Sequence, residues 1–202
     1  DRVNNYQSIG YNIYMFWIRK WGRELKTKNV ALIAMMTAII IVLGFVPPIP
    51  LGFIPVPLVL QNMGIMLAGA ILGSKRGFLS VIIFLLLVAV GLPLMTGGRG
   101  GVAVFVGATA GYIYAYPFAA ALIGYGLKKF SHSNLWLELL IVWVVGVIFI
   151  DILGAIGLTA IAHMPFIKAL ISNLVFIPGD TIKALVVVLI YRRLKKMNIV
   201  EA

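Results

Sequence analysis

The chain has 202 residues, of which 62% are hydrophobic and 11% are charged, and its mean hydropathy is +1.06. These values exclude an ordinary soluble domain and are typical of an integral membrane protein. The net charge of +11 would suggest a nucleic-acid partner in a soluble protein, but here the basic residues stand at the ends of apolar runs, so they predict membrane orientation and no nucleic-acid partner.

The first 28 residues mix aromatic and basic side chains. Such a mixture is typical of a helix in the membrane interface, so we expect an interfacial segment over 1–28 that carries no chemistry. Its first part also fits a remnant of recombinant expression. A single membrane domain in contact with the lipid bilayer is predicted over 29–197, followed by a cytoplasmic tail over 198–202.

Six hydrophobic runs make up this domain, and several are near or below the length of a standard membrane span. We therefore predict an all-α integral membrane protein with six transmembrane helices, whose ends stop short around a cavity or tilt. The last run should bend at Pro178 and Gly179, because Pro178 removes a backbone donor there. The runs cover about residues 29–46, 57–73, 77–92, 102–126, 135–162 and 166–191.

Two unusual segments separate some of these runs. Residues 47–57 hold five of the nine prolines and are otherwise apolar, so we expect this linker to pack down as a lid. Residues 97–101, Gly-Gly-Arg-Gly-Gly, offer backbone N–H groups around Arg99 that suit a carboxylate. An ordinary flexible outer loop is the alternative interpretation of 97–101.

The distribution of basic residues indicates how the helices are oriented. When the loops are assigned alternately to the two sides, all but three of the 17 lysines and arginines fall on the side of the termini. The exceptions are Arg99, Lys168 and Lys183. Because cytoplasmic loops are enriched in Lys and Arg, we predict that both termini are cytoplasmic and that the linker and the glycine-rich loop face outward.

Asp180 and Lys183, within the last run, are the strongest candidates for a binding site. Either charge alone costs roughly 2.5 to 3.5 kcal/mol at a bilayer centre, so both must face a bundle interior or a cavity. Because they are three residues apart, they share one helix face. The pair predicts a binding site that opens outward, and a salt bridge that only fixes helix packing is the alternative.

Other polar residues of the runs are weaker candidates. Gln61 and Asn62 lie about one turn into the second run, where their amides can bond to a ligand or hold neighbouring helices together. Asp151 is the third charge within the membrane. It could tune the site, carry a proton, or pair with Lys183 or a neighbouring helix.

Small residues mark two helix faces that permit close approach. Ala34 and Ala38, four apart on the first run, form a small-xxx-small face that suits either internal packing or a partner helix. Gly107, Gly111 and Ala115 form a similar stripe on the fourth run, which we expect to pack internally.

Four segments resemble, in order and in register, the signatures of one known family. They are Pro-Val-Pro-Leu-Val-Leu-Gln at 55–61, Gly-Gly-Arg-Gly-Gly at 97–101, Gly-Ala-Thr-Ala-Gly-Tyr at 107–112 and Ile-Pro-Gly-Asp-Thr-Ile-Lys at 177–183. That family is BioY, the biotin-specific substrate-binding (S) component of energy-coupling factor (ECF) transporters, and the resemblance runs from about residue 26 to the end. The chain departs from the expected pattern at Asn62, Ala108 and Ala110, which affects details of the pocket.

The resemblance implies an S-component fold that captures biotin from outside the cell, with no enzymatic activity, cofactor or metal of its own. Uptake would require a transmembrane T component and two cytoplasmic ATP-binding-cassette (ABC) ATPases, in a prokaryotic plasma membrane. The pair Ala34 and Ala38 matches the face by which S components contact the T component.

The resemblance also implies roles toward biotin for the candidate residues. Asp180 would accept from the ureido N–H groups, and Lys183 would donate to an oxygen of the ligand. Gln61 and Asn62 would add amide contacts, while Arg99 and its loop would close over the carboxylate end. The wall of the pocket and the contact with the apolar bicycle would come from Thr109, Tyr112, Phe176 and Trp143.

Two other classes of function stay open from the residues alone. A proton-coupled secondary transporter of a small anionic vitamin would use Asp180 or Asp151, but the chain shows no second half that resembles the first in inverted form. An intramembrane enzyme would need a constellation of nucleophile, base or metal. The chain has no cysteine, and its two histidines, His132 and His163, stand in no metal-ligand spacing.

Overall fold

The computed structural model describes residues 27–52, 55–130 and 134–197. The predicted interfacial segment lies outside the described residues except for Thr27 and Lys28, and so does the predicted tail over 198–202. The described chain is helical throughout its membrane domain, with only two isolated β-bridges in its loops.

The helices follow the hydrophobic runs closely. The continuous rod α5–η2–α6 covers the whole of the predicted fifth run, and its middle element η2 is a π-helix. The elements are α2 (Thr27–Gly44), α3 (Gln61–Ala89), η1 (Val102–Phe105), α4 (Ala110–Phe130), α5 (Leu135–Trp143), η2 (Val144–Phe149), α6 (Ile150–Ala162), α7 (Phe166–Asn173) and α8 (Phe176–Lys196).

Helix α3 contains two membrane helices joined by a tight turn at Gly73. Gly73 has φ 76° and ψ −177°, a conformation that glycine adopts without a steric penalty. A Cβ on Gly77 would lie 2.7 Å from the carbonyl oxygen of Ala68, so the chain folds back closely on itself across this turn. The predicted second and third runs are therefore two helices, with a shorter connection than the sequence indicated.

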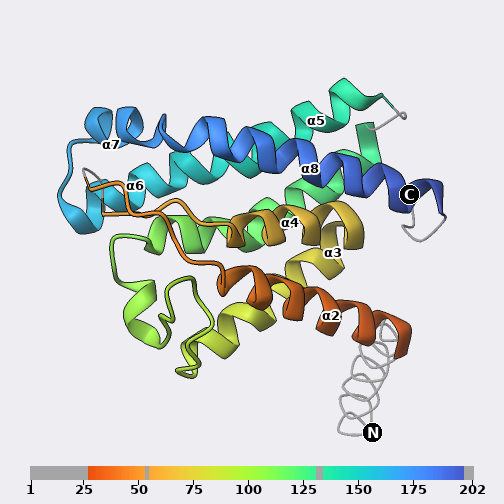
Figure 1. The fold of residues 1–202 in the computed structure, drawn as a ribbon, viewed down its shortest axis with the longest axis horizontal. Helices are drawn as coiled ribbons and strands as arrows, with labels where there is room; N and C mark the ends of the chain where they lie inside the picture. The colour runs from red at the N-terminus through yellow and green to blue at the C-terminus, as the bar shows by residue number, and fades with distance from the viewer. Residues whose placement is uncertain (1–26, 53–54, 131–133, 198–202) are drawn as a thin grey trace, which may run out of the picture.

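Three of the described helical segments are long and apolar enough to cross a membrane, namely α2, the whole of α3 and the rod α5–η2–α6. The pair α7 and α8, bent by 51°, makes a fourth. With α3 counted as two helices and α4 added, the all-α membrane fold has the predicted six helices. Figure 1 shows them side by side, roughly parallel to the long axis of the molecule.

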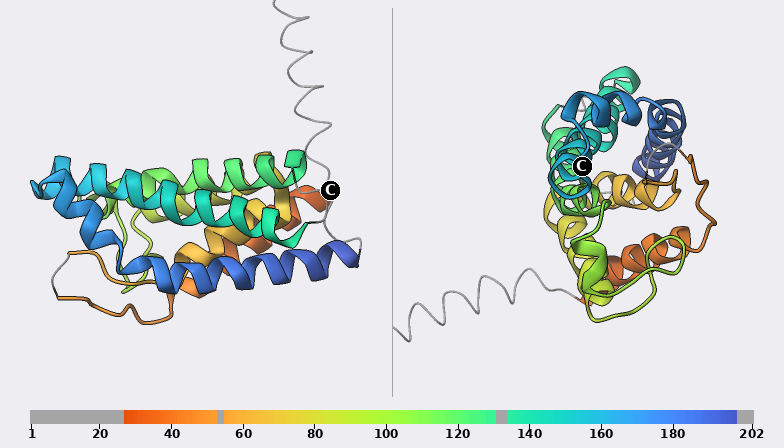
Figure 2. Two further views of the ribbon diagram at one scale, coloured as in Figure 1. Left: turned by 90° about the horizontal axis from the view of Figure 1, so that it is seen from above. Right: turned by 90° about the vertical axis from the view of Figure 1, so that its left-hand side faces the viewer.

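The two ends of the bundle differ in the way the charge pattern predicted. The start of α2, the turn at Gly73 and the end of α8 gather at one end (Figure 1). These segments carry Lys28, Lys75, Arg76, Arg192, Arg193, Lys195 and Lys196, whereas Arg99 and Lys168 belong to the segments at the opposite end. The linker after α2, the loop between α3 and α4, and the turn between α6 and α7 gather at the opposite end (Figure 2). The predicted outward-facing loops thus meet above the same end of the bundle.

Two predicted boundaries were wrong, and each has a backbone cause. The fourth helix begins at Ala110 because residues 102–105 form a short 3₁₀-helix and the chain turns before α4 starts. The bend of the last run falls between Asn173 and Phe176. Pro178 lies within the first turn of α8, where an N–H has no intrahelical partner, so proline is accommodated without breaking the helix.

Close glycine contacts hold the helices around the core. A Cβ on Gly111 would lie 2.8 Å from Cα of Gly157, so α4 and α6 touch almost backbone to backbone. Ala115, one turn further along α4, is fully buried. The predicted internal packing is confirmed for these two positions. Gly107 precedes α4, and a Cβ there would meet only the carbonyl oxygen of Ala103, at an ordinary contact distance of 3.4 Å.

Candidate functional site

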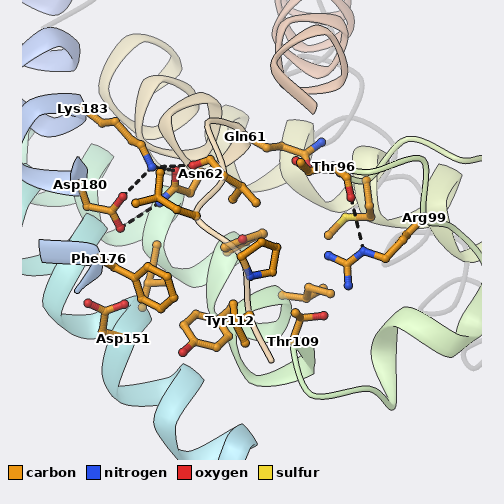
Figure 3. A pocket seen from close by; sticks show the side chains of 18 residues that line it. Gln61, Asn62, Thr96, Arg99, Thr109, Tyr112, Asp151, Phe176, Asp180 and Lys183 are labelled. Carbon is orange, nitrogen blue, oxygen red and sulfur yellow. Dashed lines mark hydrogen bonds and ion pairs between the residues drawn. The ribbon is translucent and has the colours of Figure 1, made fainter. Parts of the chain in front are cut away.

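A cavity lies inside the bundle beneath the outward-facing loops (Figure 3). It contains about 570 Å³ of empty space, part of which is open to solvent. Its walls come from the linker, the loop before α4, and helices α3, α4, α6 and α8. The 18 lining residues are Val56, Pro57, Leu58, Val59, Gln61, Asn62, Met95, Thr96, Arg99, Thr109, Tyr112, Ile113, Tyr116, Ile150, Asp151, Phe176, Asp180 and Lys183.

Asp180, Lys183 and Asn62 form a closed hydrogen-bonded ring at one end of the cavity (Figure 3). The Lys183 ammonium lies 2.6 Å from Oδ1 of Asp180 and donates to Oδ1 of Asn62 at 3.0 Å. The Asn62 amide in turn donates to Oδ2 of Asp180 at 3.1 Å. A third donor of Lys183 reaches the carbonyl oxygen of Val59 at 2.5 Å, so the ring also fixes the end of the linker.

This ring keeps acceptor capacity free for a ligand. Lys183 uses its three donors on described partners, but each carboxylate oxygen of Asp180 accepts only one of the bonds described here and has a further lone pair. Both charged side chains are only 6% exposed and line the cavity. The end of the cavity is therefore suited to a ligand group that donates hydrogen bonds.

Gln61 lies next to Asn62 in sequence but has a different task. Its amide nitrogen donates to the carbonyl oxygens of Ile40 and Leu94 at 3.2 and 2.9 Å. Its oxygen accepts from the backbone N–H and the hydroxyl of Thr96 at 3.1 and 3.2 Å. Gln61 thus joins α2, α3 and the outer loop, and these bonds use its amide donors and its carbonyl oxygen.

Arg99 defines the opposite end of the cavity. It is exposed, unlike the buried charges of the ring, and its Nε donates to the carbonyl oxygen of Thr96 at 3.3 Å. Gly97, Gly98 and Gly101 have positive φ values, which let the loop turn tightly around the arginine. The remaining guanidinium donors can reach an anion in the cavity, in agreement with the geometry in Figure 3.

Tyr112 and Phe176 form an aromatic wall between the two ends. Their rings pack edge to face with centroids 6.3 Å apart. The Tyr112 hydroxyl donates to Oδ1 of Asn173 at 2.7 Å, and the Asn173 amide donates to the backbone oxygen of Asp151 at 2.8 Å. The ring of Tyr112 occupies the space that Gly154 leaves open, because a Cβ there would collide with it.

The structure brings together eight of the nine predicted site residues. Asp180, Lys183, Gln61, Asn62, Arg99, Thr109, Tyr112 and Phe176 all line the cavity. Trp143 does not: its indole N–H donates to Oγ1 of Thr181 at 2.9 Å on the helix pair α5 and α8. The predicted contact of Trp143 with the ligand is therefore not supported, because its place in the fifth run does not give its distance from the cavity.

Sequence reasoning missed several lining residues. Thr96 precedes the glycine-rich loop and is held by Gln61, while Tyr116 lies one helical turn after Tyr112. The helical spacing of Tyr112 and Tyr116 was a signal that could have found the second tyrosine. No local pattern marks Asn173, which supports the wall from the end of α7.

Comparisons with known proteins agree on one family. The model of the BioY family matches residues 19–199. The biotin transporter BioY of Lactococcus lactis subsp. cremoris is 54% identical over 176 residues, which cover 86% of this chain and 93% of the relative. The biotin transporter BioY of Rhizobium etli is 41% identical over 174 residues, covering 83% and 93%. A crystal structure of the S-component for biotin from an ECF-type ABC transporter superposes with a TM-score of 0.83 at 53% identity, covering 86% of this chain and 93% of that one.

Proposed function

Because the chain belongs to the BioY family, we propose that it is the biotin-binding S component of an ECF-type ABC importer in a prokaryotic cell membrane. The observation that carries this proposal is the two-ended cavity. A hydrogen-bond acceptor end at Asp180 and a cationic end at Arg99 are separated by the aromatic wall of Tyr112 and Phe176. Biotin has the matching sequence of groups: a ureido ring, an apolar bicycle and a chain that ends in a carboxylate.

Each group of the ligand then has a stated partner. The ureido head donates to Asp180, whose oxygens have free lone pairs, and Asn62 and Lys183 hold that carboxylate in position. The bicycle packs on the ring faces of Tyr112 and Phe176, and the carboxylate accepts from Arg99. The protein itself carries out no reaction in this proposal.

An exposed face of α2 is the proposed docking site for a partner protein. Ala34 and Ala38 are both exposed, whereas Ile33, Met36 and Thr37 of the same helix are buried. The exposure of the two alanines among the described residues supports a partner interface over the internal packing that the sequence left open. We propose that a helix of the T component packs on this face by close backbone approach, and that two ABC ATPases supply the energy.

Ligand identity is the first test. Purified protein should release biotin, identified by mass spectrometry, and should bind added biotin in calorimetry. Asp180→Asn should lower biotin affinity at least tenfold, or about 1.5 to 3 kcal/mol, because a charged acceptor is replaced by a neutral amide. Trp143→Phe is the matched control, since Trp143 lies off the cavity and should leave affinity unchanged. Release of another vitamin, or unaltered binding by Asp180→Asn, would contradict the proposal.

Docking on α2 needs a separate test. Ala34→Trp with Ala38→Trp should retain biotin binding by the isolated protein but lose co-purification with the T component and ATP-dependent uptake. The control is Phe118→Trp with Leu122→Trp, which are also four apart and exposed, but on α4. Equal uptake in both double variants would exclude the α2 face, and uptake without any ATPase would favour a proton-coupled transporter.

A further inference from the structure

Asp151 of α6 is a buried acid that the proposed function leaves without a role. It lines the cavity and is only 7% exposed. Its Oδ2 is buried without a hydrogen-bond partner, and no cation of the described chain lies within ion-pair distance of the carboxylate. In Figure 3 it lies below Phe176, at the end of the cavity where Asp180 stands.

The two cations that line the cavity do not pair with Asp151. Lys183 donates to Asp180, Asn62 and Val59, and Arg99 lies toward the opposite end of the cavity (Figure 3). Asp151 therefore did not form the pair with Lys183 that the sequence left open. An unpartnered buried polar group costs folding free energy, and a carboxylate costs more than a neutral group. Such a group is retained more readily where a ligand supplies the missing partner.

The helix that carries Asp151 is shaped so that this residue faces inward. The buried face of the rod runs from Glu138 and Val142 to the adjacent residues Gly146 and Val147, and then to the adjacent residues Ile150 and Asp151. The face becomes two residues wide within the π-helix η2 (Val144–Phe149), so that Asp151 is buried together with Ile150. One additional residue in a turn shifts the later side chains by about 100° around the axis, and π-bulges of this kind are frequent at functional sites.

We propose that Asp151 is a second hydrogen-bond acceptor for the head of the ligand, and that it determines specificity for a head with two N–H donors. This inference rests on the proposed function. A cyclic urea carries two N–H groups on opposite sides of one carbonyl group. Asp180 accepts from one of them and Asp151 from the other.

Binding and stability together test this role. Asp151→Ala should lower biotin affinity at least tenfold but raise the melting temperature of the ligand-free protein by about 2 °C or more, because an unpaired buried acid is removed. A residue needed only for packing would lower both quantities. Thr159→Ala is the control on the same helix: its hydroxyl bonds only to the backbone of Ala155 and lies outside the cavity, so biotin affinity should not change.

Biotin analogues methylated on one or the other ureido nitrogen identify the contact. Wild-type protein should bind both analogues at least tenfold more weakly than biotin. In Asp151→Ala, the penalty for one of the two methyl groups should disappear, while the penalty for the other should persist because Asp180 is unchanged.

The outcomes separate this inference from the proposed function. If wild-type protein does not bind biotin, the proposed function fails. If wild-type protein binds biotin and Asp151→Ala binds it equally well, or keeps both methyl penalties in full, the role of Asp151 is overturned and the proposed function stands.

Discussion

At one end of the cavity, Asn62, Asp180 and Lys183 hold one another across α3 and α8, and each is 7% exposed or less. At the other end, Arg99 is exposed on a glycine-rich loop and its Nε bonds to a backbone oxygen of the same loop. The first end is built on helices and is fixed before a ligand arrives. The second end is built on a loop that the Gln61 side chain joins to α3 through Thr96.

This difference indicates that the two ends of the cavity contribute differently to stability and to ligand affinity. Buried charges must be paired, so the side chains at the helical end are held in one geometry. This end therefore recognises a ligand whose hydrogen-bonding groups match that geometry. An exposed arginine is solvated in the free protein, so its ion pair with a ligand contributes less binding free energy, and this contribution depends on the salt concentration. We expect substitutions at the helical end to change both stability and affinity, and those at the loop end to change chiefly affinity.

The largest effect is expected when the buried ion pair is broken. Lys183→Met leaves Asp180 charged and unpaired, and this should destabilise the protein by about 3 to 5 kcal/mol and abolish high-affinity biotin binding. Thermal unfolding in detergent and calorimetry measure the two quantities. Lys183→Met combined with Asp180→Asn should recover most of the stability without recovering binding; recovery of binding would show that the pair serves packing alone.

A smaller effect is expected at the residue that joins the two ends. Gln61→Leu leaves the carbonyl of Leu94 and the backbone N–H of Thr96 without their amide partner, at a cost of about 1 to 3 kcal/mol of stability. Affinity should fall less than in Asp180→Asn, because the helical end is intact. Hydrogen exchange of the loop at residues 94–99 should increase. An unchanged exchange rate there would exclude Gln61 as the anchor of the loop.

At the loop end itself, Arg99→Gln should reduce biotin affinity about tenfold, which corresponds to roughly 1.4 kcal/mol, with little change in stability. The neutral amide of biotin should bind wild type and variant alike, because it has no carboxylate to pair with the arginine. The affinity difference for biotin should also shrink at high salt. Equal losses for biotin and its amide would place the carboxylate elsewhere.

The smallest effect is expected outside the cavity. Trp143→Phe removes one hydrogen bond to Thr181 and should cost about 0.5 to 1.5 kcal/mol of stability. Biotin affinity should be unchanged, as measured by calorimetry. A clear loss of affinity would show that packing between α5 and α8 controls the ring of Asp180, and the two regions would then not be independent.

Helix-forming runs and buried charges were readable from the sequence because their signals are local. A run of apolar residues predicts a membrane helix wherever it occurs, and a charge inside it requires an interior position. Pro178 indicates the wrong position for the bend, because a proline inside a helix and one in its first turn look the same in sequence. Only the position of the helix start, at Phe176, distinguishes the two cases.

The functions of neighbouring residues could not be told apart in the same way. Gln61 and Asn62 were equal candidates, yet one holds backbone and loop while the other bonds to Asp180. Which groups each of these two side-chain amides contacts depends on how α3 is rotated against α2 and α8. That rotation is fixed by close contacts between distant residues, such as Gly64 against Ile40, and no pattern along one helix reports it.

The sequence by itself determined the membrane class, six helices, the family resemblance and the residues Asp180 and Lys183; the orientation of the helices in the membrane stays a prediction. Each of these follows from composition, from the length of a run or from a contiguous motif. The tertiary structure decided that Trp143 lies off the cavity, that Thr96, Tyr116 and Asp151 line it, and that Ala34 and Ala38 are exposed. These facts depend on helix rotation and on the extra residue in the π-helix, and both are set by packing between segments far apart in the chain.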